Sequence, residues 1–431
     1  MTGITDLTGG NRELLLKKLF SRESGIPEDV RKAAAAIVDD VRKRGDTALF
    51  EYTSRFDGIL LEAGNILVSE QEINEAIGQV PADVIRAMER AAENIRAFHR
   101  RQVQQSWLDI GEGKALGQKI TPLARAGVYV PGGRAAYPSS VLMNVIPARV
   151  AGVGEIIMAT PPMRDGSVYA NTLAAAKIAG VDRIYKMGGA QAIAAMAFGT
   201  AIVPRVDKIT GPGNIWVAAA KREVFGYCGI DSIAGPSEVL IVADGKANPR
   251  YAAADMLAQA EHDPMASAML VTCSRVLAEQ VAGELKRQLS ALGRAEIASQ
   301  SISDFGEIIV TGTLEEAIAL ANEIAPEHLE LLVEEPLRWL GAVSNAGAIF
   351  LGETSPEPLG DYMAGPNHIL PTGGTARFSS PLSVDDFVKK SSVVYYSKEM
   401  LKSVYQDIAV FAASEGLDAH ARSALIRFEE D

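Results

Sequence analysis

The apolar residues in the first hundred positions of the chain recur at helical spacing. Between residues 27 and 45 they fall three or four positions apart, at Val30, Ala34, Ile37, Val38 and Val41. This period places them on one face of a helix, and Gly45 is typical of a helix end. A second stripe runs from residue 84 to residue 99, after Ser69 and Glu72 at the spacing of a capping box. The pattern predicts that this part of the chain is largely helical.

After residue 121 the chain changes to short apolar runs separated by glycine and proline. The first series of runs comprises residues 127–130, 155–160, 183–187 and 207–210. The second series comprises residues 239–243, 269–273, 308–311 and 348–351. Such runs are typical of buried strands, and alanine-rich helical patterns lie between them, for example at 172–179 and 190–198. Strands that alternate with helices predict parallel sheets covered on both faces, here in two α/β domains.

The alternation of strands and helices stops beyond Pro381. The remaining residues show helical patterns and one short strand-like run at 393–396, so we expect a C-terminal arm. A chain of 431 residues also exceeds the size at which a single hydrophobic core usually stops growing. Two large domains with smaller appendages are therefore the expected organisation.

The composition excludes several kinds of partner and site. The formal net charge is -12 and there is no long basic run, so nucleic acid is not an expected partner. Residues 1–22 lack a basic segment followed by an apolar one, and no apolar stretch is long enough to span a bilayer, which predicts a cytoplasmic protein. Cys228 and Cys273 are the only cysteines, which excludes a disulfide framework and a thiolate-rich zinc site. A metal would have to be held by imidazole, carboxylate or amide groups.

One of the five histidines is paired with a glutamine at helical spacing. Gln259 and His262 lie three residues apart near the end of a predicted helix, so an amide oxygen and an imidazole share one face. Asp361 and His420 are the obvious candidates for further ligands, and such a site suits zinc, or else manganese or cobalt. A histidine near a helix C-terminus is also favoured by the helix dipole alone, so the spacing leaves both interpretations open. His99 lies on the apolar helical stripe and is expected to be structural.

Glu327 and His328 follow directly after a predicted helix at residues 314–324. Pro326 should interrupt that helix, and a carboxylate and an imidazole at a helix break are well placed to project into a cleft. Adjacent residues point in different directions on a helix or a strand, so the two would serve different steps rather than form a bonded pair. The alternative is an ordinary surface turn.

Three Gly-Pro clusters, at residues 211–214, 235–238 and 365–368, have the composition of ligand-binding loops. Glycine lets the backbone approach a ligand closely, and proline stiffens the loop. A predicted helix at 215–224 follows the first cluster, and its N-terminus could receive a phosphate. However, no Gly-x-Gly-x-x-Gly fingerprint follows a strand in this chain, so the loops could equally be turns of an α/β fold.

Taken in order along almost the whole chain, these segments resemble the histidinol dehydrogenase family. The matching segments are residues 42–46, 53–57, 127–133, 188–192, 211–214, 235–238, 259–263, 326–330, 361–371 and 415–420. The resemblance implies a homodimer of two Rossmann-like parallel-sheet domains with small helical N-terminal and C-terminal arms. The expected division is an N-terminal arm at 1–25, a first α/β domain at 26–128 plus 238–380, a second Rossmann-like domain at 129–237 and a C-terminal dimerisation arm at 381–431.

The resemblance also implies the residues of the site. Zinc, one ion per subunit, would be bound by Gln259, His262, Asp361 and His420. The catalytic acid and base residues would be Glu327 and His328. The substrate L-histidinol would be held by Ser237, Gln259, His262, His328, Asp361, His368, Glu415 and His420. NAD would contact Tyr129, Gln191 and Asn214, an unusual cofactor site that accounts for the missing fingerprint. The tail with Glu415 and His420 would cross to complete the site of the neighbouring subunit.

The implied reaction is an NAD-dependent four-electron oxidation of histidinol to histidine through histidinal, the final steps of histidine biosynthesis. Two hydride transfers with an addition of water between them require a base for the alcohol and a base for the water. We assign His328 to the alcohol, because an imidazole titrates near the working pH, and Glu327 to the water. Zinc would act as a template for the imidazole and amino nitrogens of the substrate.

Other functions compete with this interpretation. The nearest is a dehydrogenase of the same fold that acts on another small alcohol, such as the sulfopropanediol dehydrogenases that resemble this family. His368 and Glu415 argue against it, since a carboxylate suits the imidazole and ammonium of histidinol better than a sulfonate. A zinc hydrolase could also use Glu327, His328 and a metal, but it would reduce no NAD. A non-catalytic metal-binding protein would gain stability from zinc without turnover.

Overall fold

The computed structural model describes residues 3–7, 12, 13, 15, 17, 26–132 and 136–429, and the chain divides into two compact units. The first unit comprises Met1–Gln102 and Leu123–Phe387, and the second comprises Val103–Pro122 and Val388–Asp431. Most of the predicted N-terminal arm at 1–25 lies outside the described residues, as does the end of the matching segment 127–133. Among the helices that the structure describes, none combines the length and the apolar character needed to cross a membrane.

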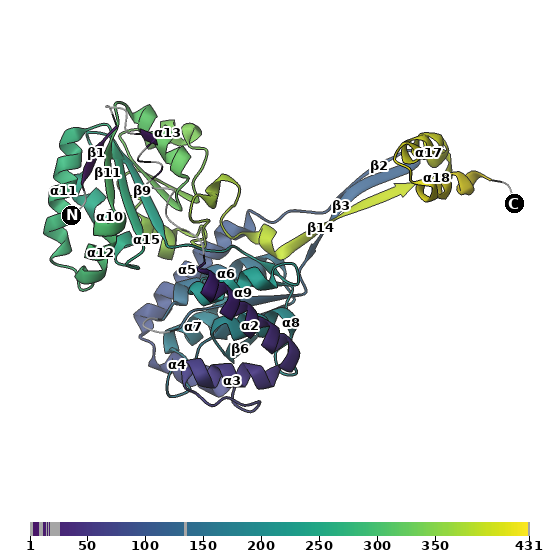
Figure 1. The fold of residues 1–431 in the computed structure, drawn as a ribbon, viewed down its shortest axis with the longest axis horizontal. Helices are drawn as coiled ribbons and strands as arrows, with labels where there is room; N and C mark the ends of the chain where they lie inside the picture. Colours follow the sequence, from purple (N-terminus) through teal and green to yellow (C-terminus); the bar gives the residue numbers. More distant parts are fainter. Residues whose placement is uncertain are drawn as a thin grey trace. The chain divides into compact units, whose positions relative to one another are not determined.

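The first unit contains a five-stranded parallel sheet with the strand order β6-β5-β4-β7-β8 (Figure 1). Its strands are β4 (Arg125–Tyr129), β5 (Glu155–Thr160), β6 (Arg183–Lys186), β7 (Lys208–Thr210) and β8 (Gly229–Ile230). The chain enters this sheet at β4 and continues outward to β5 and β6. It then forms β7 and β8 on the other side of β4. This order creates a topological switch point between β4 and β7, where open α/β sheets usually bind ligands.

Helices cover both faces of the five-stranded sheet. Alternate strand residues such as Val128 and Met158 share a core with α4 (Glu70–Gln79), α5 (Ala82–Arg100), α6 (Pro138–Ala151) and α7 (Ala170–Ala179). On the opposite face, Ile157 and Tyr185 share a core with α2 (Glu28–Arg44), α3 (Asp46–Asp57), α8 (Gly189–Phe198) and α9 (Ile215–Val224). The predicted helices before residue 100 are therefore confirmed, and Ser69 and Glu72 form the predicted capping box.

The helices α2–α5 belong to residues 26–128, which we grouped with residues 238–380. Their packing differs from that grouping. These four helices bury their apolar faces against the sheet formed by β4–β8 and against the helices that cover it. An amphipathic stripe shows that one face of a helix is buried, but it does not show which sheet buries it. The grouping could not be decided from the stripe alone.

A six-stranded parallel sheet in the same unit has the strand order β1-β11-β10-β9-β12-β13 (Figure 1). Its strands are β1 (Ile4–Asp6), β9 (Glu238–Ala243), β10 (Ser267–Thr272), β11 (Glu307–Val310), β12 (His328–Leu332) and β13 (Ala348–Leu351). One face packs against α10 (Pro249–Ala260), α11 (Arg275–Leu289) and α12 (Ala295–Phe305), and the other packs against α13 (Leu314–Ile324). Two parallel sheets with helices on both faces confirm the predicted α/β fold class.

The second unit is a three-stranded antiparallel sheet followed by helices. The strand order is β14-β3-β2, formed by β2 (Trp107–Gly111), β3 (Lys114–Pro122) and β14 (Val388–Tyr396). The helices are α16 (Lys398–Lys402), α17 (Tyr405–Ser414) and α18 (Asp418–Leu425). The predicted run at 393–396 is the end of β14. The unit includes residues 103–122, which the predicted arm at 381–431 did not, because pairing between strands so distant in sequence leaves no local signal.

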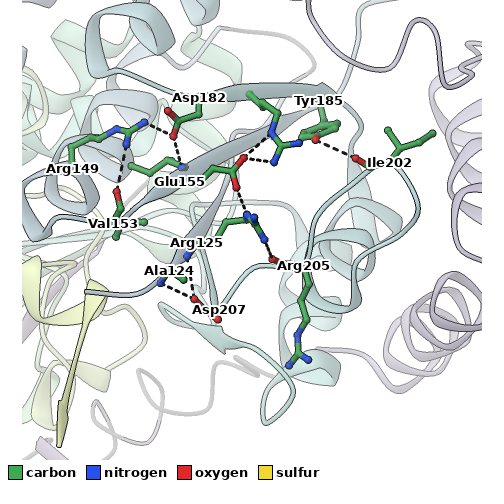
Figure 2. Close-up of polar contacts among 12 residues, drawn as sticks. Ala124, Arg125, Arg149, Val153, Glu155, Asp182, Tyr185, Ile202, Arg205 and Asp207 are labelled. Atoms are coloured by element: carbon green, nitrogen blue, oxygen red, sulfur yellow. Dashed lines mark hydrogen bonds and ion pairs between the residues drawn. The ribbon is translucent and has the colours of Figure 1, made fainter. Parts of the chain in front are cut away.

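A polar network holds the amino ends of the strands in the five-stranded sheet (Figure 2). Glu155, at the start of β5, accepts hydrogen bonds from Arg125 and Arg183, which begin β4 and β6. Asp207, just before β7, accepts hydrogen bonds at 2.9 and 3.1 Å from the backbone N–H groups of Ala124 and Arg125. The network therefore ties neighbouring strand starts together.

Replacing Glu155 by Gln is expected to lower the free energy of unfolding by about 2 kcal/mol, because two arginines lose a charged partner. Burial alone would raise the pKa of Glu155, but the hydrogen bonds from Arg125 and Arg183 outweigh burial and lower it. The extra stability is therefore present above the ordinary glutamate pKa of about 4.3 and is lost as the pH falls through the lower pKa of the folded state. Denaturant unfolding at several pH values measures both effects.

Glu70→Gln is the matched control for this stability prediction. Glu70 pairs with Lys177 at 3.1 Å, but the two side chains are 75% and 51% exposed, so its loss should cost less than about 1 kcal/mol. Ligand binding at the carboxyl ends of these strands should be unchanged in both variants, since the network lies at their amino ends. A loss of stability at Glu155 that is the same in acid as at neutral pH would contradict the role of its charge.

Candidate active site

The amino end of β12 carries two of the predicted residues next to the amino end of β9. Glu327 directly precedes β12 and His328 is its first residue, and their exposed fractions are 6% and 4%. The backbone N–H of Glu238, the first residue of β9, donates a hydrogen bond to Glu327 Oε2 at 2.8 Å. The carbonyl oxygen of Glu238 lies 2.9 Å from His328 Nδ1. A single residue of β9 therefore positions both side chains.

The hydrogen bond to Glu238 decides which ring nitrogen of His328 can act as a base. A carbonyl oxygen only accepts hydrogen bonds, so Nδ1 carries the proton and Nε2 has the free lone pair of a neutral imidazole. Burial lowers the pKa of His328 to about 4, so the ring does not titrate near the working pH, as we expected of an ordinary imidazole, but stays neutral there. His328 Nε2 is buried, and none of the described residues provides a hydrogen-bond partner for it. The geometry is that of a general base whose accepting nitrogen is left for a reacting hydroxyl group.

Glu327 is placed in an environment that makes its carboxylate a stronger base. Burial raises the pKa of Glu327 well above its usual value, and the charges of Glu238 and Asp361 raise it further, although the hydrogen bond from Glu238 lowers it. A raised pKa brings a carboxyl group closer to the working pH, as general bases require. Glu327 Oε2 lies 3.8 Å from His328 Nδ1, so the two side chains are not hydrogen-bonded to each other.

His262, Glu357 and Asp361 form a cluster with the geometry of a metal site. One donor atom from each residue lies within 4.8 Å of the others. His262 is in the turn after α10, Glu357 begins α15 (Glu357–Leu359), and Asp361 lies in the π-helical turn Gly360–Ala364 that follows. The amide of Gln259, with its nitrogen toward Glu357, donates hydrogen bonds to both carboxylate oxygens at 2.9 and 3.1 Å. The structure thus brings together three of the four predicted metal ligands.

Sequence reasoning missed Glu357. This side chain is 2% exposed, and burial together with the charges of Asp361, Glu330 and Glu327 raises its pKa well above the usual value. Its spacing of four residues from Asp361 was an available signal, because one helical turn would put both carboxylates on the same face. The glycine and proline of the intervening Glu-Pro-Leu-Gly segment obscured that turn. A bound cation would relieve the repulsion among these carboxylates.

The remaining predicted substrate residues divide between the two units. His368 Nδ1 lies 3.7 Å from Asp361 Oδ1, and Ser237 directly precedes β9. Glu415 follows the end of α17 and His420 lies in α18, so both belong to the second unit and the first unit by itself does not contain them.

The three predicted NAD residues follow the carboxyl ends of strands in the five-stranded sheet. Tyr129 ends β4, and its hydroxyl oxygen accepts a hydrogen bond at 3.1 Å from the backbone N–H of Gly189. Gln191 lies in the first turn of α8, after β6. Asn214 precedes α9, after β7, and its Oδ1 accepts hydrogen bonds from two backbone N–H groups of the first turn. The carboxyl ends of parallel strands meet at one edge, so all three residues lie along that edge, with β4 and β7 on the two sides of the switch point.

These features define an α/β protein of two parallel sheets, with buried imidazole and carboxylate groups arranged for acid-base chemistry beside a cluster of metal-ligand type. Its sequence matches the profile of the histidinol dehydrogenase family over residues 21–428, and the chain belongs to this family.

Individual relatives cover nearly the whole chain. The histidinol dehydrogenase of Halalkalibacterium halodurans is 58% identical over 402 residues, which are 93% of this chain and 94% of the relative. The histidinol dehydrogenase of Geobacter sulfurreducens is 54% identical over 428 residues, 98% and 99% of the two chains. The crystal structure of histidinol dehydrogenase from Elizabethkingia anophelis is 38% identical, has a TM-score of 0.92 and covers 99% of this chain and 97% of its own. The similarity therefore extends over both compact units.

Proposed function

We propose that the protein is an NAD-dependent, zinc-requiring oxidoreductase that converts L-histidinol to L-histidine through L-histidinal, the final steps of histidine biosynthesis. The observation that carries the proposal is the geometry at His328, in a chain of the histidinol dehydrogenase family. Its neutral imidazole presents a buried Nε2, to which no described residue is hydrogen-bonded, next to a buried carboxylate and a cluster of metal-ligand type. Alcohol oxidation requires such a base, because the hydroxyl proton must leave together with a hydride.

Gln259, His262 and Asp361 would hold the zinc ion, with His420 as the fourth ligand, and Glu357 is close enough to share it. The donor set fits this metal, since zinc accepts imidazole nitrogen and carboxylate oxygen. The crowding of Glu357 and Asp361 supports the same conclusion, because a cation would stabilise both carboxylates. When bound, zinc supplies a Lewis acid that can orient the imidazole and amino nitrogens of the substrate.

His328 acts in the first oxidation. Its Nε2 accepts the hydroxyl proton of histidinol while a hydride leaves the carbon that bears the hydroxyl group for the nicotinamide. The hydrogen bond from Nδ1 to the Glu238 carbonyl holds the ring in position and stabilises the imidazolium that forms. The product of this step is histidinal.

Glu327 acts on the water that adds to histidinal. Its carboxylate removes a proton from the water as the oxygen attacks the aldehyde carbon. The His328 imidazolium formed in the first oxidation returns its proton to the aldehyde oxygen, which gives a diol and leaves Nε2 ready to accept a proton again. His328 Nε2 then accepts a proton from the diol as the second hydride leaves for a second NAD, and the carboxylic acid that results ionises to the carboxylate of histidine. Retention of the aldehyde between the two oxidations protects a reactive intermediate from solvent.

NAD would contact Tyr129, Gln191 and Asn214. Gln191 Oε1 is buried and finds no hydrogen-bond partner in the described parts of the chain, so it is available to a ligand. Asn214 stands at the N-terminus of α9, and helix N-termini favour phosphate groups. The carboxyl edge of the sheet also has the topology of a dinucleotide site.

The protein would function as a cytoplasmic homodimer in which the second unit completes the site of the neighbouring subunit with Glu415 and His420. Both residues are exposed in the single chain. The same unit exposes several large apolar side chains, among them Trp107, Ile110, Val394, Tyr395, Val410 and Phe411. An apolar surface of this kind is typical of an interface between subunits.

The purified protein, mixed with L-histidinol and NAD, is expected to produce two NADH per histidinol. Removal of the metal with a chelator should abolish NADH formation, and added zinc should restore it, because zinc would fix the substrate against the nicotinamide. Absorbance of NADH and quantified zinc measure both effects. No NADH from histidinol, but turnover of another small alcohol, would keep the fold and overturn the substrate. Full activity of the metal-free protein would overturn the zinc requirement.

A further inference from the structure

The backbone N–H and the carbonyl of Gly211 are both hydrogen-bonded to the side chains of a buried ion pair. The backbone N–H of Gly211 donates a hydrogen bond to Asp231 Oδ2 at 2.7 Å, and the ammonium group of Lys221 donates one to the Gly211 carbonyl at 2.6 Å. The same ammonium group forms an ion pair with Asp231 Oδ1, and the two side chains are only 5% and 4% exposed. Each charge is therefore bonded both to its partner and to the loop.

The loop 211–214, which the ion pair holds, packs directly against the backbone of Tyr129. Gly211 has φ +116°, a left-handed conformation that favours glycine. A Cβ atom at this position would lie 2.0 Å from the carbonyl oxygen of Tyr129, so only glycine permits the approach. The end of β4 and the turn after β7 are in direct backbone contact at the switch point of the sheet.

The ion pair also connects the loop to the two elements that follow it. Lys221 lies on α9, the helix capped by Asn214, and Asp231 directly follows β8. The backbone N–H of Asp231 donates a hydrogen bond to the Ile209 carbonyl of β7, and Asp231 Oδ1 accepts one from the N–H of Ser232. Strands β7 and β8, helix α9 and the loop 211–214 are thus fixed relative to one another through two side chains.

We propose that Lys221 and Asp231 are positioning residues for the dinucleotide. Through their hydrogen bonds to the N–H and the carbonyl of Gly211, which we call the clamp, they hold Tyr129 and Asn214 in the arrangement that receives NAD. The proposal rests on the assignment of NAD to this edge of the sheet. Neither charged side chain needs to touch the cofactor, since both act through the backbone of Gly211. A buried ion pair is costly to desolvate and can be replaced by apolar residues without loss of stability, so its value here lies in the geometry that it imposes on the loop.

The test compares variants that remove the clamp to different degrees. Asp231→Leu and Lys221→Met each remove one partner, whereas Asp231→Asn keeps an oxygen that can accept the hydrogen bond from the Gly211 N–H. If the loop is competent for a tenth of the time, the apparent Kd for the dinucleotide rises about tenfold. We therefore expect Asp231→Leu and Lys221→Met to raise the KM for NAD by about tenfold, with Asp231→Asn between them and the wild type. The kcat at saturating NAD and the KM for histidinol should stay within about twofold, because the clamp does not touch the site at β12.

Direct binding provides the second readout. Trp216 lies two residues after Asn214, so energy transfer from tryptophan to bound NADH can report dissociation constants without turnover. Lys208→Met is the matched control, since Lys208 forms a partly buried ion pair with Asp386 at 2.7 Å, with 15% of the lysine side chain exposed, and lies at the amino end of β7, at the opposite edge of the sheet from the loop. This control should leave the affinity for NADH unchanged.

Each outcome decides the proposal. Folded Lys221→Met and Asp231→Leu proteins with unchanged KM for NAD and unchanged NADH affinity would overturn it. Equal changes in kcat and in both KM values, reproduced by Lys208→Met, would show a role in stability alone and would overturn it as well. Should the two stronger variants fail to fold, Asp231→Asn decides by the same criteria. A wild-type protein that binds NADH but forms none from histidinol would refute the proposed function, while the NADH titrations would still test the clamp.

Discussion

Replacing Asp361 by Asn is expected to remove the metal and the activity together. An amide is a much poorer zinc ligand than a carboxylate, and the change also removes the charge that lies 3.7 Å from His368. We expect zinc to bind at least about 100-fold more weakly, because even changes outside the ligand shell cost 10- to 100-fold. Oxidation of histidinol at ordinary zinc concentrations should fall in proportion to the metal lost. Quantified zinc after dialysis, measured beside NADH formation, checks both quantities.

The control for this prediction is Asp263→Asn. Asp263 is an exposed residue next to His262, and its Oδ1 accepts a hydrogen bond from the backbone N–H of Met265 at 2.8 Å, which an asparagine can also accept. It removes one negative charge close to the cluster without removing a ligand, so zinc and activity should both be retained. An active Asp361→Asn protein that contains no metal would refute the role of zinc as a template for the substrate.

Much of the fold could be predicted from the sequence because its elements are defined locally. The apolar run at 155–160 is β5, and the helix expected at 215–224 is α9, each with the bounds that the pattern indicated. The hairpin of β2 and β3 could not be predicted in this way. Its strand β2 is exposed along its whole length, so it lacks the alternation of apolar and polar residues by which a half-buried strand is recognised. Its pairing with β14 depends on a contact that the local sequence does not encode.

The chemistry of the candidate site depends on strand register more than on sequence spacing. Glu327 and His328 were recognisable as a carboxylate and an imidazole at a helix break, but their roles follow from the residue opposite them. His328 pairs with Val239 in the sheet, and this register brings Glu238 within hydrogen-bonding distance of both side chains. The free Nε2 of His328 is a consequence of that contact. No pattern within residues 325–330 could have predicted it.

The two sheets would use opposite ends of their strands. The predicted NAD residues follow the carboxyl ends of β4, β6 and β7, as the topology of an open parallel sheet leads one to expect. Glu327, His328 and Glu238 lie at the amino ends of β12 and β9, where the last turn of α10 and the turn after it also lie. Helices that run antiparallel to their strands end at the amino edge, so a site built from helix ends and strand starts can gather Gln259 and His262 there. Only half of the proposed site therefore lies at the carboxyl ends of strands.

Replacing Glu327 by Gln should impair the oxidation of histidinal more than the oxidation of histidinol. The amide of Gln can still accept the hydrogen bond from the Glu238 N–H, so the register of β9 and β12 and the position of His328 should be retained. The variant loses the base that activates water, and general bases contribute about 10²- to 10⁴-fold. We expect the rate with histidinal to fall by at least about 100-fold and the rate with histidinol by less than about tenfold, so the yield should move from two NADH per histidinol toward one. Single-turnover NADH formation from each substrate measures the two rates separately. Glu334→Gln, an equivalent change at an exposed residue soon after β12, should leave both rates unchanged. An equal loss of both half-reactions in a Glu327→Gln protein that retains zinc would show that Glu327 serves the alcohol as well, and the division of roles between Glu327 and His328 would have to be abandoned.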